Sequence, residues 1–129
     1  MSTGADGTSS GYYHPEGYPT LFAESGATAV NSFSFAASGA GVHQVLLVQG
    51  IDVTAYGAQP VHCFAQLVSP LGYTFWWDSQ STGEGLGVRW NWRGAIPVRY
   101  FQSLTFSATA DANISWGGVM WGQTAPRGY

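Results

Sequence analysis

Apolar and polar residues alternate in short runs along most of the chain, which is the pattern of half-buried β-strands. The clearest example is residues 88–93, where a valine and two tryptophans alternate with two arginines and an asparagine. Apolar runs over 43–53 and 61–68 predict two further strands, and the first of these either carries a bulge at Gly50 or is covered on both faces. No stretch of 11 or more residues is free of Gly, Pro or this alternation, so we expect no helix.

Turn-forming residues separate the apolar runs at intervals of about 8–12 residues, and the runs add up to about seven or eight strands. The spacing predicts an all-β fold, an antiparallel β-sandwich of jelly-roll-like type, although an immunoglobulin-like strand order stays open. The expected turns lie at 38–41, 57–60, 69–72, 94–97 and 109–113, with a polar loop over 78–85.

Residues 1–28 have no sustained periodicity and consist mainly of Gly, Ser, Thr, Ala, Tyr and Pro. We expect them to form an extended N-terminal arm, followed by a sandwich domain over residues 29–129. Prolines favour extended or turn conformations, and tyrosines offer rigid, amphipathic contact area. Tyr12, Tyr13 and Tyr18 are therefore candidate interface residues.

The chain of 129 residues is long enough for one domain, and its composition is unusual. Charged residues make up 9% of the chain, against about 25% in ordinary proteins, whereas aromatic residues make up 16%. This composition excludes a coiled coil and a disordered chain. Four scattered arginines and a net charge of -3 also argue against a nucleic-acid partner.

Neither a membrane nor a secretion pathway is expected. The longest aliphatic run, residues 45–48, is far shorter than a membrane-spanning helix. The N-terminus has neither the basic start nor the apolar core of a signal peptide, so we expect synthesis in the cytoplasm.

Metal and thiol chemistry find little support. His14, His43 and His62 are the only imidazoles, and no two of them have the short spacing of a metal site on one element. The single Cys63 lies in an apolar run, which predicts a buried, unreactive thiol. We expect no metal and no cofactor.

The sequence gives equally little support for a glycosidase or for a phosphate-binding loop. A glycosidase needs two carboxylates across a cleft, but of Asp52, Asp78, Glu84 and Asp111, three lie in predicted loops. The glycine-rich segment 83–87 lacks the Lys of a phosphate-binding loop and precedes a strand instead of a helix. We therefore expect that the protein is not an enzyme.

Trp76 and Trp77 are neighbours in a predicted strand, so they point to opposite faces and one of them must lie on the outer face. The outer ring is covered by another part of the chain, contacts another subunit or stacks on a sugar. Arg89 and Arg93 share the polar face of their own strand. We include all four residues in the candidate interface.

Two functions fit these features. Scarce charge and abundant aromatic residues are typical of interface cores and favour a non-enzymatic assembly protein. The alternative is a carbohydrate- or receptor-binding module with exposed tryptophans.

A small sandwich with an extended arm, and a last third that contains residues 92–98, 104–108 and 114–116, resembles the jelly-roll-like head and decoration proteins of tailed bacteriophages. The resemblance covers residues 29–122 and depends on pattern, not on a motif. It implies a virion protein assembled in the host cytoplasm as a capsid decoration or a minor head or tail component. It further implies partners that include copies of itself, for instance in a trimer, and other virion proteins such as a major capsid protein.

Overall fold

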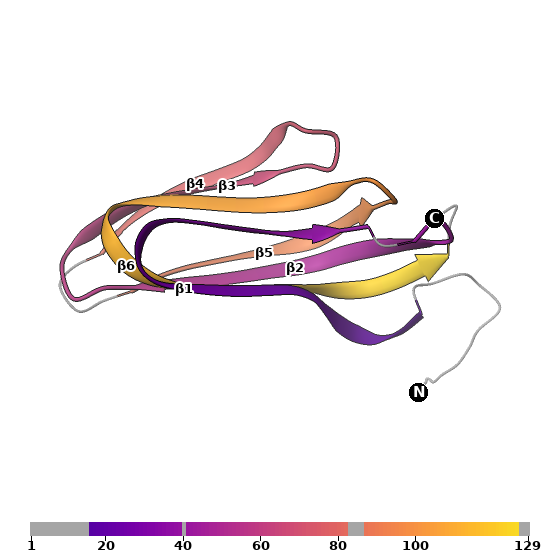
Figure 1. The fold of residues 1–129 in the computed structure, drawn as a ribbon, viewed down its shortest axis with the longest axis horizontal. Coiled ribbons are helices and arrows are strands. Elements are labelled where there is room, and N and C mark those ends of the chain that lie inside the picture. Colours follow the sequence, from indigo (N-terminus) through magenta and orange to yellow (C-terminus); the bar gives the residue numbers. More distant parts are fainter. Residues whose placement is uncertain (1–15, 40, 83–86, 127–129) are drawn as a thin grey trace.

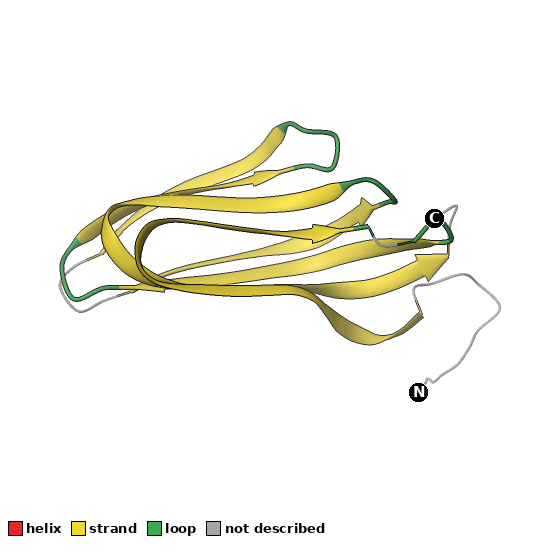
Figure 2. Cartoon of the chain, in the orientation of Figure 1, coloured by secondary structure: helices red, strands yellow, loops and turns green. Residues whose placement is uncertain are grey.

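A computed structural model of the chain describes residues 16–39, 41–82 and 87–126, with side chains from Thr20 onward. Within this part every regular element is a strand (Figure 2), which confirms the expected all-β class. The strands are β1 (Glu16–Ser38), β2 (Gln44–Tyr56), β3 (Val61–Val68), β4 (Thr74–Thr82), β5 (Gly87–Val98) and β6 (Ser103–Pro126).

No helix among the described residues has the length and apolar character needed to cross a membrane.

The two longest strands, β1 and β6, bend and run through both layers of the molecule (Figure 1). They pair antiparallel from Glu16↔Thr124 to Ser38↔Ser103. The register shifts on both sides of Val30, and Ala29 has a φ of 57°, a conformation that few non-glycine residues adopt. This irregular point is the corner at which both strands pass from one sheet to the other.

The corner divides β6 between two sheets. Its first half pairs with β3, from Val68↔Thr105 to Cys63↔Ala110, and its second half pairs with β2, from Tyr56↔Ser115 to Gln44↔Pro126. One layer therefore has the order β4-β3-β6-β1 and the other has the order β5-β2-β6-β1. The sequence predicted seven or eight strands, and the six strands provide eight segments, four in each layer.

The order in which these eight segments pair defines the topology. In chain order, the first pairs with the eighth, the second with the seventh, the third with the sixth and the fourth with the fifth. Such nested pairing is a long antiparallel ribbon rolled into a double-sheet jelly roll. The predicted jelly-roll-like sandwich is confirmed, and the immunoglobulin-like order is excluded.

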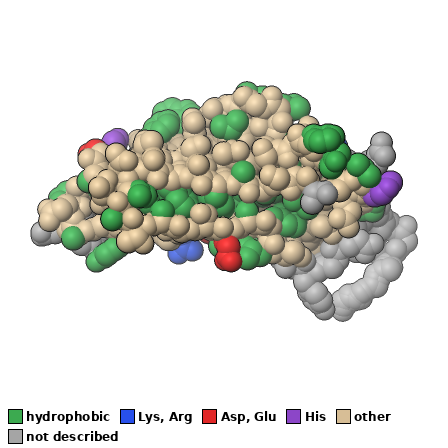
Figure 3. Space-filling view, in the orientation of Figure 1, with side chains coloured by type: hydrophobic (Ala, Val, Ile, Leu, Met, Phe, Trp, Pro, Cys, Tyr) green, Lys and Arg blue, Asp and Glu red, His purple; other side chains and the backbone are tan. Residues whose placement is uncertain are grey.

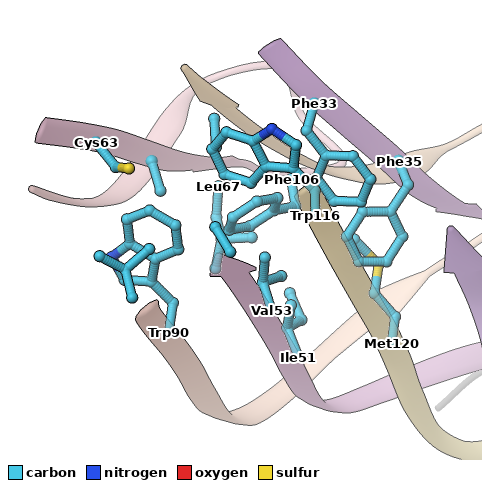
Figure 4. Packing of buried hydrophobic residues seen from close by; sticks show 14 of the residues in the cluster. Phe33, Phe35, Ile51, Val53, Cys63, Leu67, Trp90, Phe106, Trp116 and Met120 are labelled. Atoms are coloured by element: carbon cyan, nitrogen blue, oxygen red, sulfur yellow. The ribbon is translucent and has the colours of Figure 1, made fainter. Parts of the chain in front are cut away.

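Aromatic rings fill the space between the two sheets (Figure 4). The indole of Trp116 stacks between Phe33 and Trp90, with ring centroids 5.6 and 6.5 Å away and interplanar angles of 6° and 8°. Phe35 and Phe106 pack beside this stack at 5.8 Å. Burial of large rings dominates the stability of such a core and leaves its interior filled.

Three expected breaks lie inside strands. Residues 78–82 belong to β4, residues 94–97 belong to β5, and residues 109–113 form the corner of β6. Glycine and proline in β5 are tolerated because it is an edge strand with a register shift at this point. The chain turns instead at 99–102, where the Gln102 N–H donates to the Arg99 carbonyl at 2.9 Å.

The expected arm also needs correction, because residues 16–28 are part of β1 and the backbone of Tyr18 lies in that strand. Two register shifts before residue 24 interrupt the alternation of side chains, which explains why the pattern did not indicate a strand here. Tyr12 and Tyr13 lie outside the described residues.

Candidate interaction surface

The outer face of the β4-β3-β6-β1 layer carries no charged side chain among the described residues except Asp111 at the corner. Along each strand, side chains point alternately to the interior and to this outer face. Phe33, Cys63, Leu67 and Phe106 are buried between the sheets, so their sequence neighbours point outward. We call this surface the uncharged face. It consists of Ser32, Ser34, Ala36, His62, Phe64, Gln66, Trp77, Ser79, Ser81, Thr105, Ser107 and Thr109.

Two aromatic side chains stand out on the uncharged face. Phe64 on β3 and Trp77 on β4 are diagonal neighbours, since Phe64 pairs with Ser79 and Gln66 pairs with Trp77. Their rings stack with centroids 6.0 Å apart and an angle of 25°. Phe64 is 40% exposed and Trp77 is 66% exposed, so the pair presents a large apolar area to the outside.

The structure resolves how the adjacent tryptophans divide. Trp76 pairs with the buried Leu67 and packs against the core, whereas Trp77 points outward. The expectation that one of the two lies on the outer face is confirmed.

The outer face of the other layer has the opposite character: among the side chains that the structure describes, four on this face are charged. These are Glu24, Asp52, Arg89 and Arg93. We call this surface the charged face.

On the charged face, Arg93 contacts two side chains of the same chain, Asp52 and Trp121. Its guanidinium lies 3.3 Å from Asp52 and 5.0 Å from the centroid of the Trp121 ring, and the Trp121 indole N–H donates to Asp52 at 3.2 Å. The arginine side chain is 52% exposed, so the ion pair contributes at most about 1 kcal/mol to stability. The cluster mainly fixes the position of these three side chains.

Beside this cluster, a shallow groove of about 580 Å³ crosses the charged face. Gly26 and Gly117 pair with each other at its base, so the groove exists because these positions lack side chains. Glu24, Asp52 and Arg89 are among the residues that line it. Arg89 thus lies on a polar surface, away from Trp77.

The predicted interface residues therefore do not form one surface. Trp77 belongs to the uncharged face, Arg89 and Arg93 belong to the charged face, and Trp76 packs against the core. Sequence reasoning missed Phe64 and the outward serines of β1. Strand alternation in residues 32–38 and 61–68 already places Phe64 and these serines on the face opposite to the apolar residues beside them.

The titratable groups show no assembled site in the described part of the chain, where no three His, Cys, Asp or Glu side chains are placed to hold a metal. The His62 ring lies 2.7 Å from the Ser81 hydroxyl, and the backbone N–H of His62 donates to the Asp111 carboxylate at 2.9 Å. Asp78, which was expected in a loop, lies in β4 and points inward, where it accepts a hydrogen bond from Trp90 at 3.1 Å. Glu84 lies outside the described residues.

Comparisons with known proteins provide little further information. No family model matches the chain, and no relative is found among curated proteins. A chain in the structure titled "Structure of infectious bursal disease virus Gx strain" is similar, with 13% identity and a TM-score of 0.38 over 89% of this chain. The match covers 33% of that chain, so this chain spans about a third of its length.

Proposed function

We propose that this protein is a non-enzymatic structural protein that assembles into a virus particle, most specifically as a decoration or minor head or tail component of a bacteriophage. The jelly-roll topology supports this proposal, because viral capsid domains are among the proteins built as double-sheet jelly rolls, together with lectin domains and cupins. The proposal places the protein in the virion after assembly in the host cytoplasm. It binds copies of itself, for example as a trimer, and a major capsid protein.

The filled interior favours a function on the outside of the sandwich. A cupin holds its ligand between the sheets, but here Phe33, Trp90, Phe106 and Trp116 pack against one another in that space. A ligand would have to displace these rings, at a cost of several kcal/mol for each buried aromatic side chain. The choice therefore lies between assembly and surface binding of a carbohydrate.

The uncharged face is the observation that carries the assembly proposal. Interface cores are depleted in charged residues and enriched in aromatic residues, and the uncharged face has both properties around Phe64 and Trp77. Charge depletion is also confined to one side of the molecule, since the charged face carries Glu24, Asp52 and both arginines of β5. Such asymmetry is expected when one side is covered by a neighbour and the other remains in solvent.

The exposed Trp77 and the partly exposed Trp121 fit carbohydrate binding less well. Sugar stacking needs an open ring face with hydrogen-bonding groups around it. The guanidinium of Arg93 lies over the Trp121 ring, and Phe64 stacks on one side of Trp77. The groove on the charged face offers carboxylates, but Gly26 and Gly117 form its base in place of an aromatic ring.

Light scattering coupled to size exclusion, together with mobility in polysaccharide gels, separates the two functions. We expect the measured mass to rise with concentration above the chain mass of 13.7 kDa, and mobility to be the same with and without polysaccharide. A monomer at every concentration whose migration is retarded by polysaccharide would overturn the assembly proposal. Trp77→Ser identifies the ring responsible if retardation occurs.

A further inference from the structure

The two layers leave four strand edges without a neighbouring strand in the described chain. These edges belong to β4, to β5 and to the two halves of β1. An edge presents unpaired N–H and C=O groups that can accept another strand, and proteins usually block this with charges, prolines, bulges or covering side chains. The four edges differ in whether they carry such protection.

The β4 and β5 edges are protected. β5 carries Arg89, Arg93 and Pro97, and its register shifts beside Gly94. Side chains of β4 bridge to it, because the Gln80 amide donates to the Arg89 carbonyl at 2.9 Å and Asp78 accepts from the Trp90 indole.

The first half of β1 is protected in another way. It contains Pro19 and Glu24, and its register with β6 shifts twice before residue 24. Bulges twist an edge away from the flat geometry that a new strand needs.

The second half of β1 has none of these features. Residues 32–38 contain no charged residue, proline or glycine. They pair with β6 without interruption from Ser32↔Thr109 to Ser38↔Ser103. The residues that point outward are Ser32, Ser34, Ala36 and Ser38, which are small and exposed. No strand among the described residues pairs with this regular edge.

We propose that residues 32–38 pair antiparallel with the same residues of a second copy. The proposal rests on the assembly function proposed above and assigns one of its surfaces. An antiparallel pair of identical strands is self-complementary around a two-fold axis, whereas the neutral side chains of this edge offer no charge with which to select a different partner. The pairing joins two four-stranded layers into one sheet and places their uncharged faces side by side.

Figure 3 shows how few charged side chains lie on the side of the molecule that contains the β1 edges. The charged side chains that it shows lie near the outline of the molecule, and the surface between them is uncharged polar or apolar. Figure 1, in the same orientation, shows both halves of β1 crossing this region.

The test combines molecular mass with amide hydrogen exchange of the 129-residue chain. In a lone edge strand, alternate N–H groups point to solvent and exchange rapidly. We expect wild type to form a dimer with twice the chain mass of 13.7 kDa, in which consecutive amides of 32–38 are protected. Ser34→Lys places like charges near each other across the axis and should raise the dissociation constant by about tenfold or more. The matched control is Thr109→Lys, on the uncharged face but one strand away from the edge, which should leave the dimer intact.

Each other outcome has a definite meaning. A dimer in which alternate amides of 32–38 still exchange rapidly, or one weakened equally by both lysines, overturns edge pairing while the assembly function stands. A monomer with protected amides in 32–38 overturns it as well, because a part of the same chain then covers the edge. A wild-type monomer with rapid exchange contradicts both proposals. Thermal unfolding of both variants checks that the fold is retained.

Discussion

The indole N–H of Trp116 donates a hydrogen bond to the carbonyl oxygen of Val30 at 3.0 Å, at the corner where β1 passes between the sheets. The register between β1 and β6 shifts on both sides of Val30. The core tryptophan thus provides the corner with a donor where the regular ladder is interrupted. The same ring stacks on Phe33, so the corner and the core are stabilised by one side chain.

Trp116→Phe should therefore lower the free energy of unfolding by about 1–3 kcal/mol, because the Val30 carbonyl loses its donor and the smaller ring leaves a void. Urea denaturation followed by circular dichroism measures the change. The control is Trp77→Phe, at an exposed position, which should stay within about 0.5 kcal/mol of wild type. Equal effects of the two substitutions would contradict the role assigned to the Val30 bond.

Gly122 on β6 lies against the backbone of β2, and a Cβ atom at this position would overlap the carbonyl oxygen of Leu47. This close approach occurs beside the β2 bulge, between Val48 and Gly50. Gly122→Ala should cost about 1–3 kcal/mol, since the two strands must move apart. Gly41→Ala is the matched control, because nothing lies within 4 Å of its added methyl group. In thermal unfolding, Gly122→Ala should melt at a lower temperature than Gly41→Ala. An unchanged melting temperature for Gly122→Ala would contradict the close approach of β6 to β2 at this position.

Cys63 is fully buried, and burial raises the pKa of its thiol above the ordinary value, with a smaller contribution from the negative charge of Asp111. The thiol should react with an aromatic disulfide reagent at pH 8 at least about 100-fold more slowly in the native protein than in urea, because reaction requires opening of the fold. Rapid labelling of the native protein would contradict the burial of this side chain.

The same shift predicts a pH dependence of stability. The folded pKa of Cys63 exceeds the unfolded pKa, so its contribution to stability is full below the unfolded pKa and is lost as the pH rises through the folded pKa. The free energy of unfolding of wild type should decline more steeply in this alkaline range than that of Cys63→Ala. Parallel curves would contradict the raised pKa.

The N-terminal segment can be tested by two deletions. Removal of residues 2–15 takes away no pair of the described β1–β6 ladder, so the melting temperature should change by no more than a few degrees. Removal of residues 2–28 takes away half of β1, including every pair from Glu16 to Ala27, and should prevent folding. If the longer deletion melts like wild type, the first half of β1 does not stabilise the sandwich.

Tyr12 and Tyr13 are candidate interface residues, and we propose that they dock the protein to the particle. The shorter deletion should fold but lose incorporation into particles. Normal incorporation would contradict docking through these residues.

Much of the fold was predictable from the sequence, because strand periodicity is a local property. The bounds of β3 agree with the predicted 61–68, and the alternation in β5 correctly places Val88 and Trp90 inside. The errors concern residues whose local signals are overridden by tertiary contacts. From the sequence, Asp78 was expected in a loop. In the structure it lies partly buried in β4, where Trp90 and Gln80 donate hydrogen bonds that compensate for the burial of its carboxylate.

The candidate surface was less accessible to sequence reasoning. An uncharged face requires knowledge of which strands lie side by side, and Phe64 and Trp77 become neighbours only through the pairing of β3 with β4. Scarce charge indicated that some surface is covered, but not which one. Likewise, only the topology shows that Arg89 and Trp77 belong to different layers.

Sedimentation equilibrium of wild type and of Phe64→Ser/Trp77→Ser tests most directly whether the uncharged face mediates assembly, with Tyr56→Ser as the control on the other layer. Tyr56, Phe64 and Trp77 are all exposed, at 61%, 40% and 66%. None of the substitutions removes a buried side chain, so all three proteins should fold alike. We expect wild type to associate beyond the edge-paired dimer as its concentration rises, the double variant to show a dissociation constant for this second step that is higher by about tenfold or more, and the control to change it by less than about threefold. A wild-type chain that remains at 13.7 kDa up to the highest soluble concentration, or a double variant that associates like wild type, would contradict the account.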